Sequence, residues 1–215
     1  LLEQNRNRTE WATKATIDVD RVKADPQATP AQNGQAQIVL GLSLRNTEKF
    51  GEAKTVLQSA RNSVDKTEWL IVADAALREV SNPAAYYADQ AQRMYDRGQM
   101  NAALAMLDRA MPVLPVRDRA RLFAQRSLIE LDAARSKARG TLPPTELLLI
   151  AARRDAAEAV KAGLAEGHYA AGRIAEELGQ RDAAIQSYRQ AKDAHPALDA
   201  DGSRYRIALA RVLVQ

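Results

Sequence analysis

The chain has 215 residues, of which 46% are hydrophobic and 5% aromatic, and its formal net charge is +4. This length allows a sizeable core in one or two domains, and the charge is too small to indicate nucleic acid by itself. The chain has no cysteine, which excludes disulfides, thiolate metal sites and cysteine nucleophiles. No apolar run approaches the roughly 20 residues of a membrane span.

Alanine is the commonest residue, with 42 copies, and it is the best helix former. A β-protein would need more β-branched and aromatic residues, so the composition predicts an all-α chain. Arginine outnumbers lysine by 23 to 8, which we attribute to the codon bias of a GC-rich bacterial genome rather than to phosphate binding. The opening Leu-Leu-Glu-Gln indicates a fragment or a processed protein. A protein without cysteine is compatible with the bacterial cytoplasm and with the periplasm, so the sequence does not select either compartment.

Apolar periodicity and breaks predict helices along the whole chain, with the clearest break at DPQATPAQNG, residues 25–34. Single helices are predicted at 10–24 and 67–80, and two long helices are predicted in the middle of the chain. Helical hairpins are predicted on either side of them. In chain order, the predicted segments are 10–24, 34–65, 67–80, 84–115, 116–139, 143–164, 168–196 and 203–214.

Residues 168–196 carry the most informative pattern, because small residues, a turn glycine, an aromatic residue and a stopping proline occur at fixed offsets. Small residues let two antiparallel helices approach closely, and the aromatic side chain fills the gap beside them. The positions are Gly172, Gly179, Ala184, Tyr188, Ala191 and Pro196. The pattern resembles a tetratricopeptide repeat, a helix–turn–helix unit of about 34 residues.

Two further stretches match this pattern. The second copy, 84–115, has Tyr87, Ala91, Gly98, Ala103, Leu107, Ala110 and Pro115. The third copy, 34–65, has Leu40, Gly41, Ala53, Leu57 and Ala60, but Glu48 stands where the turn glycine belongs.

The resemblance implies a right-handed α-α superhelix of about ten or eleven antiparallel helices, spanning 1–215 as a single solenoid. Its clearest repeats would be 34–65, 84–115 and 165–196, with a partial or capping helix at 203–214. The extra helix at 67–80 breaks the alternation of helices near 67–83. Either the superhelix kinks there, which we favour, or 34–65 is an ordinary helical hairpin.

The resemblance also implies a non-catalytic scaffold that binds a protein or peptide on its concave face, with bacterial envelope assembly or polysaccharide export as possible settings. The groove-facing offsets fall on Arg45, Asp89, Gln92, Tyr95, Tyr169, Arg173, Glu176, Arg204 and Arg211. The carboxylate clamp of the chaperone-tail subfamily is absent, because its offsets hold Ile38, Leu42, Ala88, Gln92, Tyr169 and Arg173.

The helix predicted at 116–139 offers an alternative, because an excess of cations along it could bind an anionic polymer or nucleic acid. Its basic residues are Arg117, Arg119, Arg121, Arg126, Arg135, Lys137 and Arg139. We favour a solvated helix face with internal ion pairs over either kind of binding. Nucleic-acid binding is the less favoured of the two, because Phe123 is the only aromatic residue among these cations. Self-association through the terminal helices, giving a homo-oligomer, is a further alternative.

The sequence predicts no enzyme, no cofactor and no metal site. The two histidines, His168 and His195, have structural explanations as a hairpin-packing residue and a cation in the last turn of a helix. Glu176 and Glu177 are adjacent on one helix and therefore point in different directions. Asp199 and Asp201 precede the last helix, where capping is the ordinary role.

Overall fold

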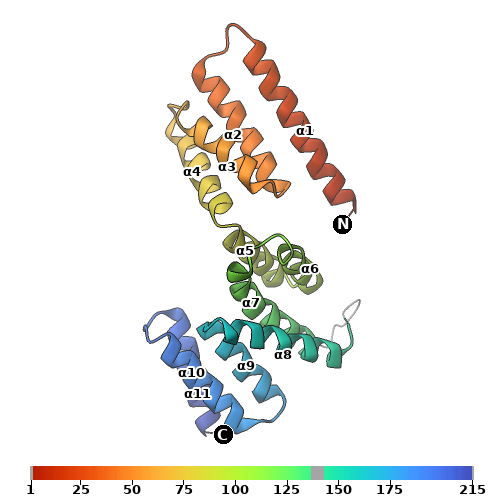
Figure 1. Ribbon diagram of the computed structural model, residues 1–215, viewed down its shortest axis with the longest axis vertical. Coiled ribbons are helices and arrows are strands. Elements are labelled where there is room, and N and C mark those ends of the chain that lie inside the picture. The colour runs from red at the N-terminus through yellow and green to blue at the C-terminus, as the bar shows by residue number, and fades with distance from the viewer. Residues whose placement is uncertain (1, 137–142, 215) are drawn as a thin grey trace. The chain divides into compact units, whose positions relative to one another are not determined.

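The computed structural model describes residues 2–136 and 143–214. Over these residues the chain forms eleven α-helices and no strand (Figure 1). The all-α class and the predicted number of helices are therefore confirmed, and neighbouring helices pack as in a helical repeat array.

Contacts within the chain divide it into two compact units, residues 1–86 and 87–215. The first unit, coloured red to yellow in Figure 1, consists of four helices and the start of a fifth. They are α1 (Leu2–Ala24), α2 (Pro30–Asn46), α3 (Phe50–Arg61), α4 (Thr67–Ser81) and the beginning of α5 (Pro83–Asp96).

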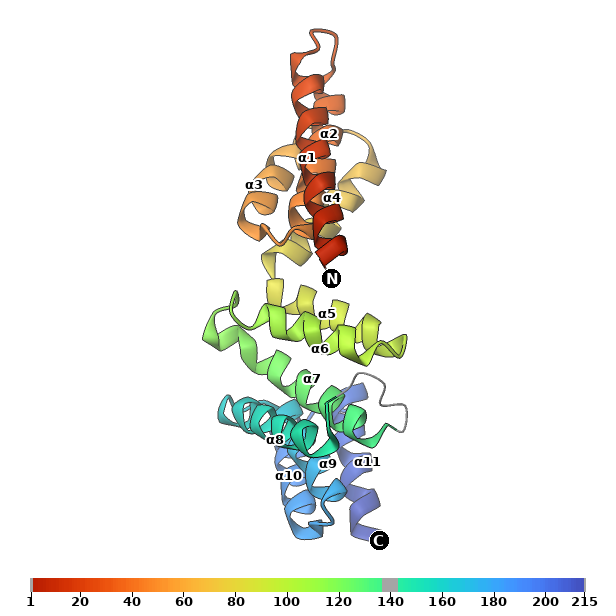
Figure 2. The same cartoon turned by 90° about the vertical axis from the view of Figure 1, so that its right-hand side faces the viewer.

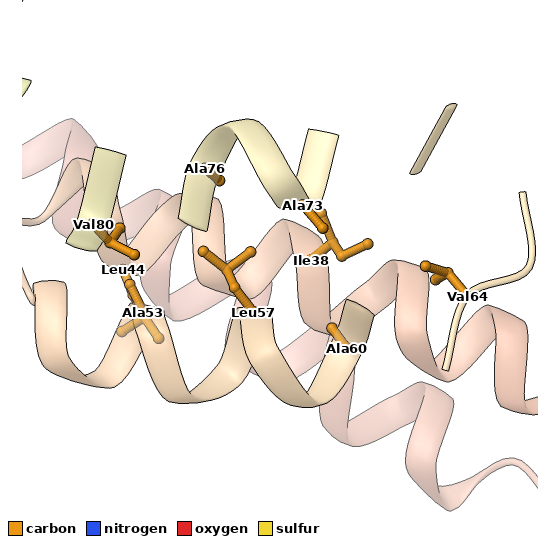
Figure 3. Close-up of a cluster of buried hydrophobic side chains, with 9 residues drawn as sticks. All are labelled: Ile38, Leu44, Ala53, Leu57, Ala60, Val64, Ala73, Ala76 and Val80. Atoms are coloured by element: carbon orange, nitrogen blue, oxygen red, sulfur yellow. The ribbon is translucent and has the colours of Figure 1, made fainter. Parts of the chain in front are cut away.

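The core of the first unit forms where α2, α3 and α4 meet (Figure 3). Ile38, Leu57 and Ala73 come from the three different helices, and each is fully buried. Gly41 allows α2 to approach α3 closely, because a Cβ at this position would lie 2.5 Å from Leu57. The predicted small–large pattern of 34–65 therefore forms a packed hairpin.

The second unit contains the rest of α5 and six further helices, of which α9, α10 and α11 are blue in Figure 2. They are α6 (Met100–Ala110), α7 (Val116–Arg135), α8 (Thr145–Lys161), α9 (Ala165–Glu177), α10 (Arg181–Ala194) and α11 (Ala200–Val214). The structure ends α7 at Arg135 rather than at the predicted residue 139. Lys137 and Arg139 lie outside the described residues.

The hairpin of α9 and α10 shows the physical basis of the repeat pattern. A Cβ on Gly172 would lie 2.5 Å from the ring of Tyr188, so only glycine allows the ring to pack there. Tyr188 is fully buried, and its hydroxyl donates a hydrogen bond to Glu176. Gly179 turns the chain with a φ of +69°, a backbone conformation that glycine adopts without steric strain.

Alternate helices contact one another within each unit, and the helices that do so change at the boundary. In the first unit α2 and α4 are joined by an ion pair between Arg45 and Glu79, at 2.6 Å. In the second unit α7 contacts α9. The alternate helices that contact each other are even-numbered in the first unit and odd-numbered in the second. The numbering changes after α4, which is the extra helix predicted at 67–80. The single solenoid over 1–215, with a kink at this point, stays a prediction.

Candidate functional site

Four alternate helices of the second unit, α5, α7, α9 and α11, are joined by polar side chains, and we call them the inner helices. The hydroxyl of Tyr95 on α5 donates to Asp132 on α7 at 2.7 Å. Arg173 on α9 donates to the other carboxylate oxygen of Asp132 at 3.4 Å. Arg211 on α11 pairs with Glu176 on α9 at 2.6 Å. These contacts hold the four helices in the order α5, α7, α9, α11.

A cleft of about 200 Å³ lies over the inner helices, and we call it the inner cleft. Every inner helix contributes to its lining, and most of the lining side chains are charged or carry an amide. The lining residues are Ala88, Asp89, Gln92, Arg121, Ala124, Gln125, Leu128, Glu166, Asp201 and Arg204. Such a surface can bind a chain of peptide groups and charged side chains.

Three of the predicted groove residues, Asp89, Gln92 and Arg204, line the inner cleft. Four others, Tyr95, Arg173, Glu176 and Arg211, form the contacts between the inner helices described above. Their polar atoms are therefore used within the chain. Arg45 lies in the first unit, where it pairs with Glu79, so the structure does not bring it into this cleft.

Tyr169 differs from the prediction, because only 7% of it is exposed. Its ring packs against Tyr188 and Tyr205, with centroid distances of 5.8 and 5.4 Å. The guanidinium of Arg204 lies over the Tyr169 ring, 4.6 Å from its centroid, which is a favourable cation–π geometry. Tyr169 therefore supports Arg204 from beneath instead of presenting its own ring to a partner.

The hydroxyl of Tyr95, predicted to face a partner, is hydrogen-bonded within the chain to Asp132. Burial and the hydrogen bond to Asp132 raise the pKa of Tyr95 to about 12, because both favour the neutral phenol. The hydroxyl thus remains a hydrogen-bond donor at every physiological pH. Tyr95 is a positioning residue between α5 and α7 rather than a titrating group.

Sequence reasoning missed four residues of the inner cleft as groove residues: Arg121, Gln125, Glu166 and Asp201. Gln125 joins α7 to α5, since its amide nitrogen donates to the carbonyl oxygen of Ala88 at 2.9 Å. The spacing of four residues from Arg121 to Gln125 places both on one face of α7. This spacing could have identified them as groove residues. We assigned Arg121 to the basic helix instead.

Within the described residues 116–135, the cations of the predicted basic helix do not share one exposed face. Arg126 is 8% exposed and is held between Asp155 on α8 and Asp108 on α6. Arg135 pairs with Glu177 on α9 at 3.2 Å. Arg126 therefore does not belong to an exposed row of basic residues along 116–139, because α7 packs against helices on several sides and buries it.

The remaining cations of α7 have different surroundings. Arg119 donates to the carbonyl oxygen of Leu114 at 2.8 Å, and Arg117 lies 3.4 Å from the carboxylate of Asp118. Arg121 faces the inner cleft. Within residues 116–135, this arrangement gives little support to a continuous site for an anionic polymer.

A buried acid near Arg126 was not predicted. Glu130 is 7% exposed, and one of its carboxylate oxygens has no hydrogen-bond partner among the described residues. Burial, together with the negative charge of Asp155, raises the pKa of Glu130 to about 8. Burial therefore favours the protonated form of Glu130.

A second hollow, of about 460 Å³, lies between α8, α9 and α10, and we call it the outer groove. Apolar side chains such as Ala156, Ile174 and Ala183 form most of its lining. It shares no lining residue with the inner cleft. The two surfaces can therefore be altered separately.

The residues considered for chemistry have structural contacts. His195 lies 2.9 Å from the carboxylate of Asp199, which also accepts a hydrogen bond from the backbone of Gly202 at the start of α11. Burial lowers the pKa of His168. In residues 2–136 and 143–214 no three metal-ligating side chains are grouped to hold an ion.

None of the described helices is both long and apolar enough to cross a lipid bilayer.

Comparison with known proteins identifies the last hairpin. The family model for the tetratricopeptide repeat matches residues 165–197, which include α9 and α10. This is the stretch in which the sequence pattern was clearest, and its identification as a tetratricopeptide repeat is confirmed. No curated protein matches the sequence.

Proposed function

We propose that this chain, whose last hairpin is a tetratricopeptide repeat, binds an extended segment of a partner protein in the inner cleft. Tetratricopeptide repeats typically form non-catalytic modules for protein–protein interaction, and the inner helices of such an array provide a concave surface.

One observation carries the proposal: a single cleft receives side chains from all four inner helices. An extended chain that crosses these helices would meet charges at Arg121 and Arg204. It would also meet the amides of Gln92 and Gln125, which already hydrogen-bond to each other within the chain. Amide side chains can both donate to and accept from a peptide backbone, and charged groups add specificity. The outer groove offers a partner few such groups, since most of its lining is apolar.

Self-association is a second candidate, and one observation favours it. On α11, Ile207 is 68% exposed and Val214 is 86% exposed, so this helix presents apolar surface to solvent. Such a face can pack against a second copy. A role in envelope assembly or polysaccharide export stays a prediction.

The proposed function is tested by comparing what three forms of the protein capture from cells that express it. The double variant Gln92→Ala with Arg121→Ala removes two exposed side chains from the inner cleft. The matched control, Ala183→Arg, changes an exposed residue of the outer groove. Quantitative mass spectrometry measures the captured proteins.

We expect a protein partner with the wild type and with Ala183→Arg, and at least about 10-fold less of it with the double variant, since truncating interface side chains costs on the order of 1–2 kcal/mol. Circular dichroism should show equal helix content in all three forms. Equal capture by the double variant, or loss of the partner with Ala183→Arg alone, would contradict the inner cleft as the binding site.

A further inference from the structure

The charges that line the inner cleft alternate in sign from one inner helix to the next. Asp89 lies on α5, Arg121 on α7 and Glu166 on α9. On α11, Arg204 follows with the opposite sign, although Asp201 already pairs with it at 3.2 Å. Three successive helices therefore present a negative, a positive and a negative group.

These three groups are available to a partner. Over the part of the chain that the structure describes, Asp89, Arg121 and Glu166 form no hydrogen bond and no ion pair with other side chains. The other acidic residues of the inner helices differ, because Asp132 and Glu176 each accept two contacts from neighbouring helices. Of the five charged residues that line the cleft, only Arg204 and Asp201 form an ion pair in the described structure.

The spacing of the helices sets the spacing of matching charges. Packed helices lie about 8–10 Å apart, and an extended chain advances about 3.3 Å per residue. A segment that crosses the inner helices therefore passes one helix about every three residues. A partner that compensates all three charges needs charged side chains at about this interval.

We propose that the inner cleft selects an extended segment in which a basic, an acidic and a second basic side chain follow one another at intervals of about three residues. This proposal rests on the proposed function, because it assumes that a segment lies across the inner helices. Basic side chains would pair with Asp89 and Glu166, and the acidic one with Arg121. The order of charges is the same in both directions, so it holds for either polarity of the segment.

The same charges disfavour a polyanion. Two carboxylates, Asp89 and Glu166, flank the one cation of the cleft that lacks an ion pair in the described structure, Arg121. A run of phosphates or uronate groups would meet both carboxylates and be repelled. A segment of mixed charge meets an opposite charge at each position, and this arrangement rejects uniformly charged competitors.

A library of random dodecapeptides displayed on phage tests the proposal with a defined probe. It is panned against the immobilised full chain and against the triple variant Asp89→Lys, Arg121→Glu, Glu166→Lys. These side chains lie outside the described hydrophobic core clusters, so the fold should be retained, and circular dichroism checks this. Shuffled peptides of equal composition are the control in fluorescence anisotropy at low salt.

We expect the wild type to enrich peptides with the basic–acidic–basic order, and the triple variant to enrich the inverse order. An enriched peptide should bind the triple variant at least about 10-fold more weakly than the wild type, because opposed charges replace matched ones. Enrichment without a charge order, or with one order in both selections, would overturn this proposal and leave peptide binding standing. No enrichment with either form would overturn the proposed function as well.

Discussion

Glu48 occupies a backbone conformation that is costly for its residue type. It connects α2 to α3 with a φ of +65°, whereas the corresponding turns after α5, α8 and α9 use Gly98, Gly163 and Gly179 with φ between +69° and +74°. A side chain with a Cβ in this left-handed region loses roughly 1–2 kcal/mol relative to the right-handed helix. The first hairpin thus folds despite its turn residue.

Glu48→Gly should therefore stabilise the chain by about 1 kcal/mol, since glycine adopts this φ without strain. The reverse change, Gly179→Ala, should destabilise it by a similar amount, and a Cβ there would meet no atom within 4 Å, so the effect is purely conformational. Urea denaturation measures both free energies of unfolding. A loss of stability with Glu48→Gly would show that contacts of the Glu48 side chain outweigh the backbone strain.

Single residues also show what the sequence could predict. The turn at Gly179 and the packing of Gly172 against Tyr188 follow from offsets, because a close approach leaves room for few residue types. The burial of Tyr169 did not follow from its offset. An aromatic residue on a helix suits a binding face as well as a core, and Tyr205, which covers it, lies 36 positions later in the sequence.

At the scale of helices, α7 is the element that joins neighbouring hairpins. Its Arg126 contacts carboxylates of both α6 and α8, and Asp155 on α8 is fully buried. Glu130 lies one turn further along and faces Asp155, Arg126, Arg154 and Asp108. Three carboxylates lie around one buried guanidinium, so a negative charge on Glu130 adds repulsion between α7 and its neighbours.

The stability of the chain should fall as pH rises from about 6 to about 9. Glu130 has a pKa of about 8 in the folded chain, above its usual value of 4.5, so the folded state binds the proton more tightly than the unfolded state. Raising the pH removes this proton and costs about 2–3 kcal/mol of unfolding free energy. Urea denaturation at pH 6 and pH 9 measures the loss.

The control is Glu130→Gln, which keeps the shape of the side chain without a titrating group. The variant should lack the loss of stability that Glu130 causes in the wild type between pH 6 and pH 9. A wild type with no loss between these pH values, or a variant that keeps the whole loss, would show that Glu130 does not hold its proton at neutral pH.

Periodicity located the helices but not their faces. Residues 116–139 were predicted as one basic helix, yet Arg121 faces a cleft and Arg126, five residues later, is buried in an ion cluster. The charges of α7 alone do not distinguish these environments, because both residues are arginines of the same helix. The partners that decide the matter, Asp108 and Asp155, lie on other helices.

At the scale of the whole chain, the two compact units are both arrays of packed helices, but they differ in their core and surface. The first builds its core from α2, α3 and α4, and the second has four inner helices and a cleft of mixed charge. The extra helix at 67–80 was predicted from helical periodicity, and it corresponds to α4. The cleft was only partly predicted, since offsets identified Asp89, Gln92 and Arg204 but not the acidic and basic residues opposite them.

The central claim is that a partner segment lies in the inner cleft, and site-specific photo-crosslinking tests it most directly. A benzophenone amino acid placed at Gln92 sits at the exposed edge of the cleft, and the same group at Ala183 lies in the outer groove. In cells that express the protein, the Gln92 probe should crosslink to one contiguous segment of a partner protein, and the Ala183 probe should not. Crosslinks to that partner from Ala183 and none from Gln92 would contradict the account.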